Sequence, residues 1–215
     1  MTTTNYLSPE DFEKMVNAIP LVTEYNKSKL IGIQVNRVPD PKEIQYALWV
    51  QYCHGLRVSE VLQLIGDDFD FDRNILTLHR TKTGFKKVKG EKKRKKQFTS
   101  IPPDLPIEVR EWIRIHRITL KVEEPKLFPF TRQLIWSYVK KAAEFAKLEL
   151  GEQQDERFIE GAWTHLIRKS RAKMMIEKGA SEVMVKVKLR HTFTVTERYT
   201  KPDINALIKW EEENL

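Results

Sequence analysis

The residues best suited to chemistry lie late in the chain, between Thr164 and Tyr199. This stretch holds His165 and Arg168, three positions apart, and then His191 and the phenol of Tyr199. An arginine binds two phosphate oxygens through its fork, a histidine donates a hydrogen bond or moves a proton, and a tyrosine oxygen can be a nucleophile. Together they favour chemistry on a phosphate, although each histidine or tyrosine alone is more often just packed or exposed.

A second arginine strengthens the case for an anion site. Arg57 lies where one helix is expected to end, near Gly55, and another to begin, near Ser59. Backbone N–H groups at the start of a helix favour an anion, and a guanidinium beside them adds positive charge. An acid, Glu60, follows three positions later.

The elements that must position these groups are two helices near the end of the chain. Thr164 as N-cap and Gly179 as the terminating residue predict a helix over 165–178. The histidine and the arginine then share one face, because positions i and i+3 are neighbours. A second short helix is expected to start at Ser181, and the connection after it would bring the other histidine and the tyrosine toward that face.

Caps and hydrophobic spacing elsewhere predict a mainly α chain with a small antiparallel β-sheet, an α+β fold. Further helices are expected over 8–19, over 40–55, from Ser59, over 105–120, from Thr131 and over 202–215. Two strands, 74–80 and 95–101, are expected to pair through a long lysine-rich hairpin connection. The stretch 21–40 stays ambiguous, and 149–161 is expected to be a polar loop.

The positive charge of the chain is concentrated in one stretch. From Arg80 to Lys96 there are ten Lys or Arg residues and one acid, Glu91, a net charge of +9 in a chain whose total is +8. A local basic patch indicates a polyanion, most often nucleic acid, and the alternative is a solvated lysine-rich loop. The residues expected to bind DNA are Arg80, Lys86, Lys87, Lys92, Lys93 and Arg94.

Composition argues against several other classes. A hydrophobic content of 40% is ample for a core. No apolar run approaches the roughly 20 residues of a membrane helix, and the N-terminus lacks a secretory signal. The single cysteine, Cys53, excludes an internal disulfide and a multi-cysteine metal cluster, so a reducing, intracellular setting is expected. Without a glycine-rich phosphate loop or metal-ligand spacing, we expect no cofactor and no metal.

In their order, these residues resemble the catalytic domain of the tyrosine recombinases, the phage-type integrases. The resemblance covers about residues 8–215 and rests on five features in the right order rather than on one specific motif. These features are Gly55-Leu56-Arg57-Val58-Ser59-Glu60, a strand leading to Lys82, His165-x-x-Arg168, His191 and Tyr199. The resemblance implies six catalytic residues, with Glu60 in support: Arg57, Lys82, His165, Arg168, His191 and Tyr199.

The resemblance also implies the reaction. In this family the phenol attacks a DNA phosphodiester, forms a 3′-phosphotyrosyl bond and leaves a free 5′-hydroxyl, without a metal or another cofactor. The two arginines would stabilise the developing charge, and a hairpin lysine would protonate the leaving oxygen. Lys82 matches that lysine best, and Lys86 and Lys87 compete with it because the lysine run makes the alignment soft. Glu60 is expected to hold the arginines or histidines in place rather than to carry a proton.

Three features depart from the family pattern. The spacing from His191 to Tyr199 is one residue shorter than in bacterial members, and Arg190 stands where many relatives have glycine. Family members usually carry a separate N-terminal helical domain, whereas this sequence begins near the start of the catalytic domain. Two explanations stay open: the sequence is a shortened form of a longer protein, or the protein is a naturally minimal member of the family.

The expected organisation is a flexible leader over 1–7, a catalytic domain over 8–200 and a tail helix over 201–215. The resemblance implies a site-specific recombinase or integrase of a mobile element, virus or plasmid. It would act on double-stranded DNA in the cytoplasm, at the nucleoid, of a prokaryotic or viral host. We expect the protein to associate with itself on DNA and to form a tetramer in synapsis. Whether it is a monomer in solution stays open.

Two other functions and two arrangements of the tail stay open. A type IB topoisomerase would use similar residues to relax DNA, and a non-catalytic DNA-binding relative would act as an accessory protein. The tail helix would either dock on a neighbouring protomer, as in the family, or pack on its own domain.

Overall fold

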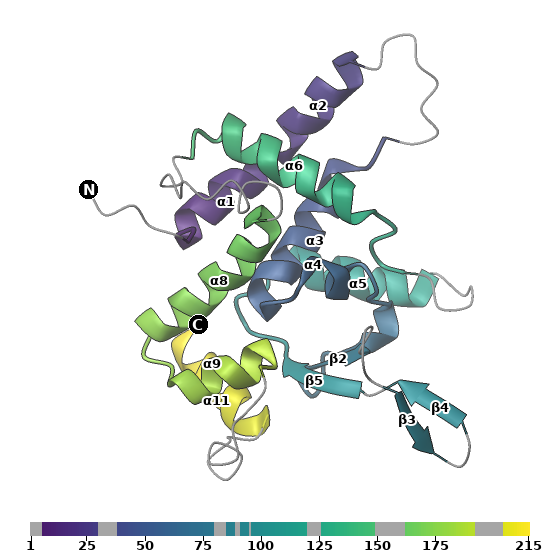
Figure 1. Cartoon of the computed structure of the whole chain (residues 1–215), viewed down its shortest axis with the longest axis vertical. Helices are drawn as coiled ribbons and strands as arrows, with labels where there is room; N and C mark the ends of the chain where they lie inside the picture. The colour runs from purple at the N-terminus through teal and green to yellow at the C-terminus, as the bar shows by residue number, and fades with distance from the viewer. Residues whose placement is uncertain are drawn as a thin grey trace.

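The computed structural model describes the backbone of residues 6–29, 38–79, 85–88, 91–94, 96–119, 126–148, 162–191 and 204–215. Within these residues the fold is mainly helical with a small antiparallel sheet, which confirms the predicted class (Figure 1). The helices are α1 (Pro9–Asn17), α2 (Ile19–Lys29), α3 (Pro41–His54), α4 (Val58–Val61), α5 (Ile107–Thr119), α6 (Arg132–Phe145), α8 (Ala162–Glu177), α9 (Glu182–Leu189) and α11 (Ile204–Asn214). The strands are β1 (Phe69–Asp70), β2 (Ile75–His79), β3 (Phe85–Val88), β4 (Glu91–Arg94) and β5 (Lys96–Ser100), and a 3-10 turn, η1 (Gly66–Asp68), precedes β1.

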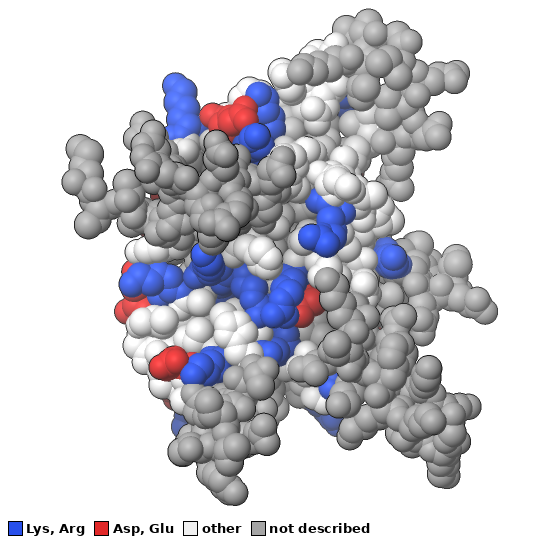
Figure 2. Space-filling model, in the orientation of Figure 1, with Lys and Arg blue, Asp and Glu red and all other residues white. Residues whose placement is uncertain are grey.

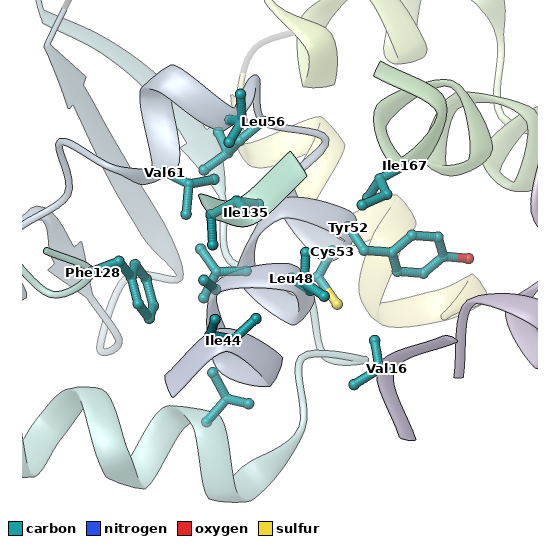
Figure 3. Packing of buried hydrophobic residues seen from close by; sticks show 14 of the residues in the cluster. Val16, Ile44, Leu48, Tyr52, Cys53, Leu56, Val61, Phe128, Ile135 and Ile167 are labelled. Carbon is teal, nitrogen blue, oxygen red and sulfur yellow. The ribbon is translucent and has the colours of Figure 1, made fainter. Parts of the chain in front are cut away.

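The core is built around α3. Asp40 caps its start by accepting a hydrogen bond from the backbone N–H of Lys42, and Gly55 ends it in the left-handed conformation at φ 59. Figure 3 shows apolar side chains of α1, α6 and α8 around those of α3. A Cβ on Gly55 would lie 2.6 Å from the Leu189 side chain, so the end of α3 lies directly against α9.

The first predicted helix, over 8–19, corresponds to α1, and a second helix follows it directly. The hydroxyl of Ser8 caps α1, as expected, but α1 ends at Asn17 and α2 begins at Ile19 with Pro20 in its first turn. A proline is tolerated there because the first N–H groups of a helix have no partner within it. The predicted helix thus ends two residues earlier than expected, and 21–29 of the ambiguous stretch is helical.

The predicted strand pair is confirmed by β2 and β5. They run antiparallel, from Ile75 opposite Ser100 to His79 opposite Lys96, and alternate residues of β2 are buried. β1 adds a third strand on the other side of β2. The connection between β2 and β5 includes a second antiparallel ribbon, β3 with β4, which carries five of the ten Lys or Arg residues of the lysine run.

The two helices expected to carry the site are α8 and α9. α8 begins at Ala162, so the prediction of Thr164 as its N-cap is wrong. Thr164 is instead buried against α3, where its carbonyl accepts a hydrogen bond from the Gln51 side chain at 2.8 Å. α9 starts as predicted, because the Ser181 hydroxyl accepts a hydrogen bond from the backbone N–H of Met184.

Both ends of the described chain are packed. The backbone N–H of Leu7 donates to the Ser170 hydroxyl at 2.8 Å, so the leader expected over 1–7 ends in a buried residue. Leu207 of α11 is fully buried in an apolar cluster with residues of α8 and α9. The tail helix therefore packs on its own domain in the single chain, which is one of its two expected arrangements.

Candidate functional site

Arg57 joins α3 to α4. α4 begins at Val58, one residue before the predicted start at Ser59, because Arg57 itself adopts the extended N-cap conformation. Its backbone N–H donates to Glu60 Oε2 at 2.7 Å, and its Nη1 donates to Glu60 Oε1 at 3.1 Å. The side chain is nevertheless 47% exposed. Arg57 therefore presents an anchored but accessible guanidinium at the surface.

Arg168 lies on α8 and is 6% exposed. Its Nη1 donates to the carbonyl of Gly55 at 2.6 Å, and its Nη2 donates to the carbonyl of Leu189. Nη1 also lies 3.8 Å from Glu60 Oε2, on the carboxylate that holds Arg57. The structure thus brings together the two arginines predicted from distant parts of the sequence.

Glu60 lies at the centre of this arginine cluster. Besides Arg57 it contacts Arg190, whose Nη2 lies 2.9 Å from Glu60 Oε2. Burial raises the pKa of this carboxyl, but the charge of Arg190, the hydrogen bond from the Arg57 backbone and the charge of Arg168 outweigh it and lower the pKa overall. One ionised carboxylate therefore lies among three guanidinium groups.

Arg190 is a further residue of the site, which was not expected from the sequence. Its side chain is 3% exposed, and its Nη1 donates to the carbonyl of Lys188 at 2.9 Å. The one signal in the sequence was that Arg190 departs from the pattern expected from the resemblance. Its partner, Glu60, lies 130 positions earlier, and no local pattern links the two.

His165 and His191 both lie beside the arginine cluster and are exposed. Partial burial, together with the charges of Arg168 and Arg57, lowers the pKa of both imidazoles. Since the ordinary value is about 6.5, both rings are neutral at pH 7, and each has a nitrogen able to accept a proton. The predicted histidines thus lie within the electrostatic field of the predicted arginines.

The surroundings of the cluster are strongly positive. Burial, with the charges of Arg190 and Arg57, lowers the pKa of Arg168 to about 10. Arg132 at the start of α6 and Lys169 on α8 extend the positive field toward the first histidine. Figure 2 shows Lys and Arg side chains gathered in a band across the middle of one face, over the places of α8 and α4 in Figure 1. A bound anion would relieve this excess of positive charge.

The remaining predicted residues lie outside the described side chains. Arg80, Lys82 and Tyr199 fall in segments that the structure does not describe. Only the backbone of β3 and β4 is described for Lys86, Lys87, Lys92, Lys93 and Arg94.

Neither a metal cluster nor a membrane helix occurs in the part of the chain that the structure describes. Within it, no group of three His, Cys, Asp or Glu side chains could hold a metal ion. Likewise, none of the helices in the described ranges has the length and apolar character needed to cross a membrane.

Comparison with known families gives the class of the protein. The model of the phage integrase family matches residues 21–205, which is most of the chain. The chain therefore belongs to the phage integrase family, the tyrosine recombinases.

Its individual relatives are distant. The tyrosine recombinase XerA of Thermococcus kodakarensis is 24% identical over 181 residues, which cover 81% of this chain and 56% of XerA. The structure of the XerH site-specific recombinase bound to difH substrate, a pre-cleavage complex, is similar with a TM-score of 0.58 and 20% identity, over 96% of this chain and 53% of XerH. The catalytic domain of bacteriophage HP1 integrase is similar with a TM-score of 0.50 and 15% identity, over 96% of this chain and 86% of that one. The fold is thus that of a tyrosine recombinase catalytic domain, and the chain spans about half the length of XerA and XerH.

Proposed function

We propose that this chain cleaves and rejoins DNA strands by transesterification through a 3′-phosphotyrosine intermediate, as a site-specific recombinase or integrase. The observation that carries the proposal is the convergence of Arg57 and Arg168 on one carboxylate, beside two neutral histidines. Donors of this type and charge suit a phosphodiester, whose transition state must be stabilised by positive groups already in place.

The two arginines bind the non-bridging oxygens of the scissile phosphate. Arg57 is accessible and meets the DNA backbone, whereas Arg168 is fixed by two carbonyls and keeps its remaining N–H groups for the anion. Because both guanidinium groups are anchored before substrate arrives, little reorganisation is needed as charge develops on the phosphate.

Tyr199 is the proposed nucleophile. Its oxygen attacks phosphorus, the bond from phosphorus to the 5′ oxygen breaks, and the protein becomes joined to the 3′ phosphate. His165 or His191 accepts the phenol proton, and a hairpin lysine, best matched by Lys82, donates a proton to the leaving oxygen. A second 5′-hydroxyl then reverses the step on a new strand, and the scheme requires no cofactor.

The proposed partner is double-stranded DNA, held by the basic face and by the lysine run. The XerH neighbour is bound to difH substrate, which supports an interaction of this kind. We further propose that 8–200 acts as the catalytic unit, that it assembles as a tetramer in synapsis, and that it works in the cytoplasm of a prokaryotic or viral host.

Covalent capture tests the proposal. The protein is incubated with nicked duplexes from a pool of randomised sequence, and the products are separated by denaturing electrophoresis. We expect protein–DNA bonds with the wild type and none with Tyr199→Phe, which lacks only the nucleophilic oxygen and should bind DNA equally well. A bond that persists in Tyr199→Phe would contradict the proposed nucleophile.

The alternatives give different results in the same experiments. An absence of covalent product with the wild type on every duplex would contradict the proposal and favour a non-catalytic DNA-binding role. Relaxation of a plasmid that lacks paired sites would indicate a type IB topoisomerase-like activity instead of strand exchange.

A further inference from the structure

Arg190 occupies a backbone position that side chains rarely take. It ends α9 in the left-handed conformation, at φ 56 and ψ 38, where helices usually place glycine. The turn is complete without the side chain, because the backbone N–H groups of Arg190 and His191 donate to the carbonyls of Val187 and Lys186 at 3.0 and 2.9 Å. A glycine would make the same turn with less strain. The arginine must therefore contribute through its side chain.

The Arg190 side chain occupies one of the hydrogen-bond acceptor positions of the Glu60 carboxylate. Glu60 Oε1 accepts from Arg57 Nη1, and Oε2 accepts from the Arg57 backbone and from Arg190 Nη2. Arg168 Nη1 lies 3.8 Å from that same Oε2, beyond hydrogen-bond distance. Without Arg190, Oε2 would have a free acceptor position beside the Arg168 guanidinium.

The same contact joins two distant parts of the site. Glu60 lies on α4, immediately after the turn that carries Arg57, whereas Arg190 immediately precedes His191. Since the Arg190 side chain is 3% exposed, it offers almost no surface for direct contact with DNA. Any effect on the site must therefore pass through its contacts within the protein, such as that with Glu60.

We propose that Arg190 is a positioning residue, which occupies Glu60 Oε2 and so keeps Arg168 directed at the scissile phosphate and His191 beside it. The contact also leaves the cluster with three guanidinium groups around one carboxylate, an excess of positive charge that the substrate can neutralise. This role rests on the proposed function, because the phosphate in question is that of the cleaved strand.

The test replaces Arg190 with glycine, the residue that suits its backbone. Arg190→Gly should lower the melting temperature only modestly, because relief of strain at φ 56 partly offsets the lost contacts with Glu60 and with the Lys188 carbonyl. Covalent-complex formation with nicked duplexes should nevertheless fall about tenfold or more, the order expected when a hydrogen bond to a charged group is removed. Lys147→Gly is the matched control: it removes a positive charge from another left-handed position, φ 51, outside the cluster, and should cleave normally.

Two readouts separate a positioning role from a structural one. In a Glu60→Gln background, Arg190→Gly should cause little further loss of cleavage, because the two residues act through one contact. In the free protein, Arg190→Gly should raise the pKa of His191 in an NMR titration. Burial and the charges of Arg168, Arg57 and Arg190 together lower that pKa in the wild type, so removal of one charge shifts it upward.

Normal cleavage by Arg190→Gly would overturn the inference, as would an equal loss in the wild-type and Glu60→Gln backgrounds. A melting temperature that falls together with activity, while the pKa of His191 is unchanged, would describe a structural residue and would also overturn it. If the wild type forms no covalent complex at all, the proposed function is contradicted, whatever the role of Arg190. In that case inorganic phosphate is the probe: it should perturb the His191 resonances less in Arg190→Gly than in the wild type, and equal perturbation would contradict the role of Arg190.

Discussion

At the scale of single residues, the two arginines of the site are held in different ways. Arg57 donates to Glu60 through its backbone N–H and its Nη1, and its side chain is half exposed. Arg168 is buried, and its guanidinium donates to the carbonyls of Gly55 and Leu189. The inner arginine is therefore part of the packed structure, whereas the outer one is not.

This difference predicts two distinct outcomes for the same substitution. Arg57→Ala should reduce covalent-complex formation by about 100- to 1,000-fold, the usual cost of removing one preorganised donor to a developing charge. Its free energy of unfolding should change little, because the side chain is half exposed. Arg168→Ala should lose as much cleavage and also stability, because two buried carbonyls lose their donor.

Urea unfolding and covalent capture, measured on both variants, separate these effects. A normal yield of covalent complex from either variant would contradict its place in the site. Equal stability of the two variants would contradict the difference in how they are held.

At the scale of elements, the end of α9 connects the arginine cluster to the tail helix. The carbonyl of Lys188 accepts a hydrogen bond from Arg190. The ammonium group of the same lysine lies 2.8 Å from Glu211 of α11, and Arg171 of α8 approaches that carboxylate at 3.6 Å. The side chains of Lys188, Glu211 and Arg171 are all buried. α9 thus contacts the site through its backbone and the tail through a side chain.

The buried ion pairs of Glu211 predict a large effect on stability. Glu211→Gln should lower the free energy of unfolding by about 3–5 kcal/mol, because it leaves the buried Lys188 ammonium group without a compensating charge, whereas Arg171 keeps its ion pair with Asp104. Glu213→Gln, two residues further along, is the matched control. Its carboxylate is 60% exposed and 3.9 Å from Lys209, so the change should stay within about 0.5 kcal/mol. Urea unfolding measures the free energy of unfolding of both variants. Equal losses in the two would show that the buried ion pairs of Glu211 add no stability over an exposed pair on the same helix.

Elements that carry their own local signals were predictable from the sequence. Helix starts at Ser8, Asp40, Thr131 and Ser181 follow from side chains that cap the next turn, and the structure has all four caps. The stretch after Pro20 stayed ambiguous, because a proline can follow the end of one helix or lie in the first turn of the next. The choice between these depends on packing that the local sequence does not express.

The site was only partly predictable for the same reason. The order of arginines and histidines predicted that Arg57 and Arg168 would meet, and the structure brings them to one carboxylate. The third arginine of the cluster could not be assigned, because its contact with Glu60 exists only once α4 and the end of α9 are packed together.

At the scale of the whole molecule, two basic regions differ in what they can bind. One is the lysine run from Arg80 to Lys96, and the other is the basic face over α8 and α4 (Figure 2). Only the second contains the arginine cluster. The first therefore suits general attraction to a DNA backbone, and the second suits the recognition of a single phosphate.

Neutralising the lysine run should weaken DNA binding without regard to sequence. With Lys92, Lys93 and Arg94 changed to Gln, the slope of log K against log salt should become shallower by about one unit for each phosphate that the protein no longer neutralises. Lys209→Gln, on the exposed side of α11, serves as the control and should leave the slope unchanged. Fluorescence anisotropy over a salt series measures both, and an unaltered slope in the triple variant would place the run away from DNA.

The lack of a side chain at Gly55 restricts which residues this position can hold. A methyl group there would be strained at φ 59 and would press on the buried Leu189 side chain. The carbonyls of these two residues hold the same guanidinium, so widening the gap between them would release it. Natural variation should therefore spare position 55 even where the surrounding surface diverges, because the smallest residue sets the spacing of the two carbonyls that hold Arg168.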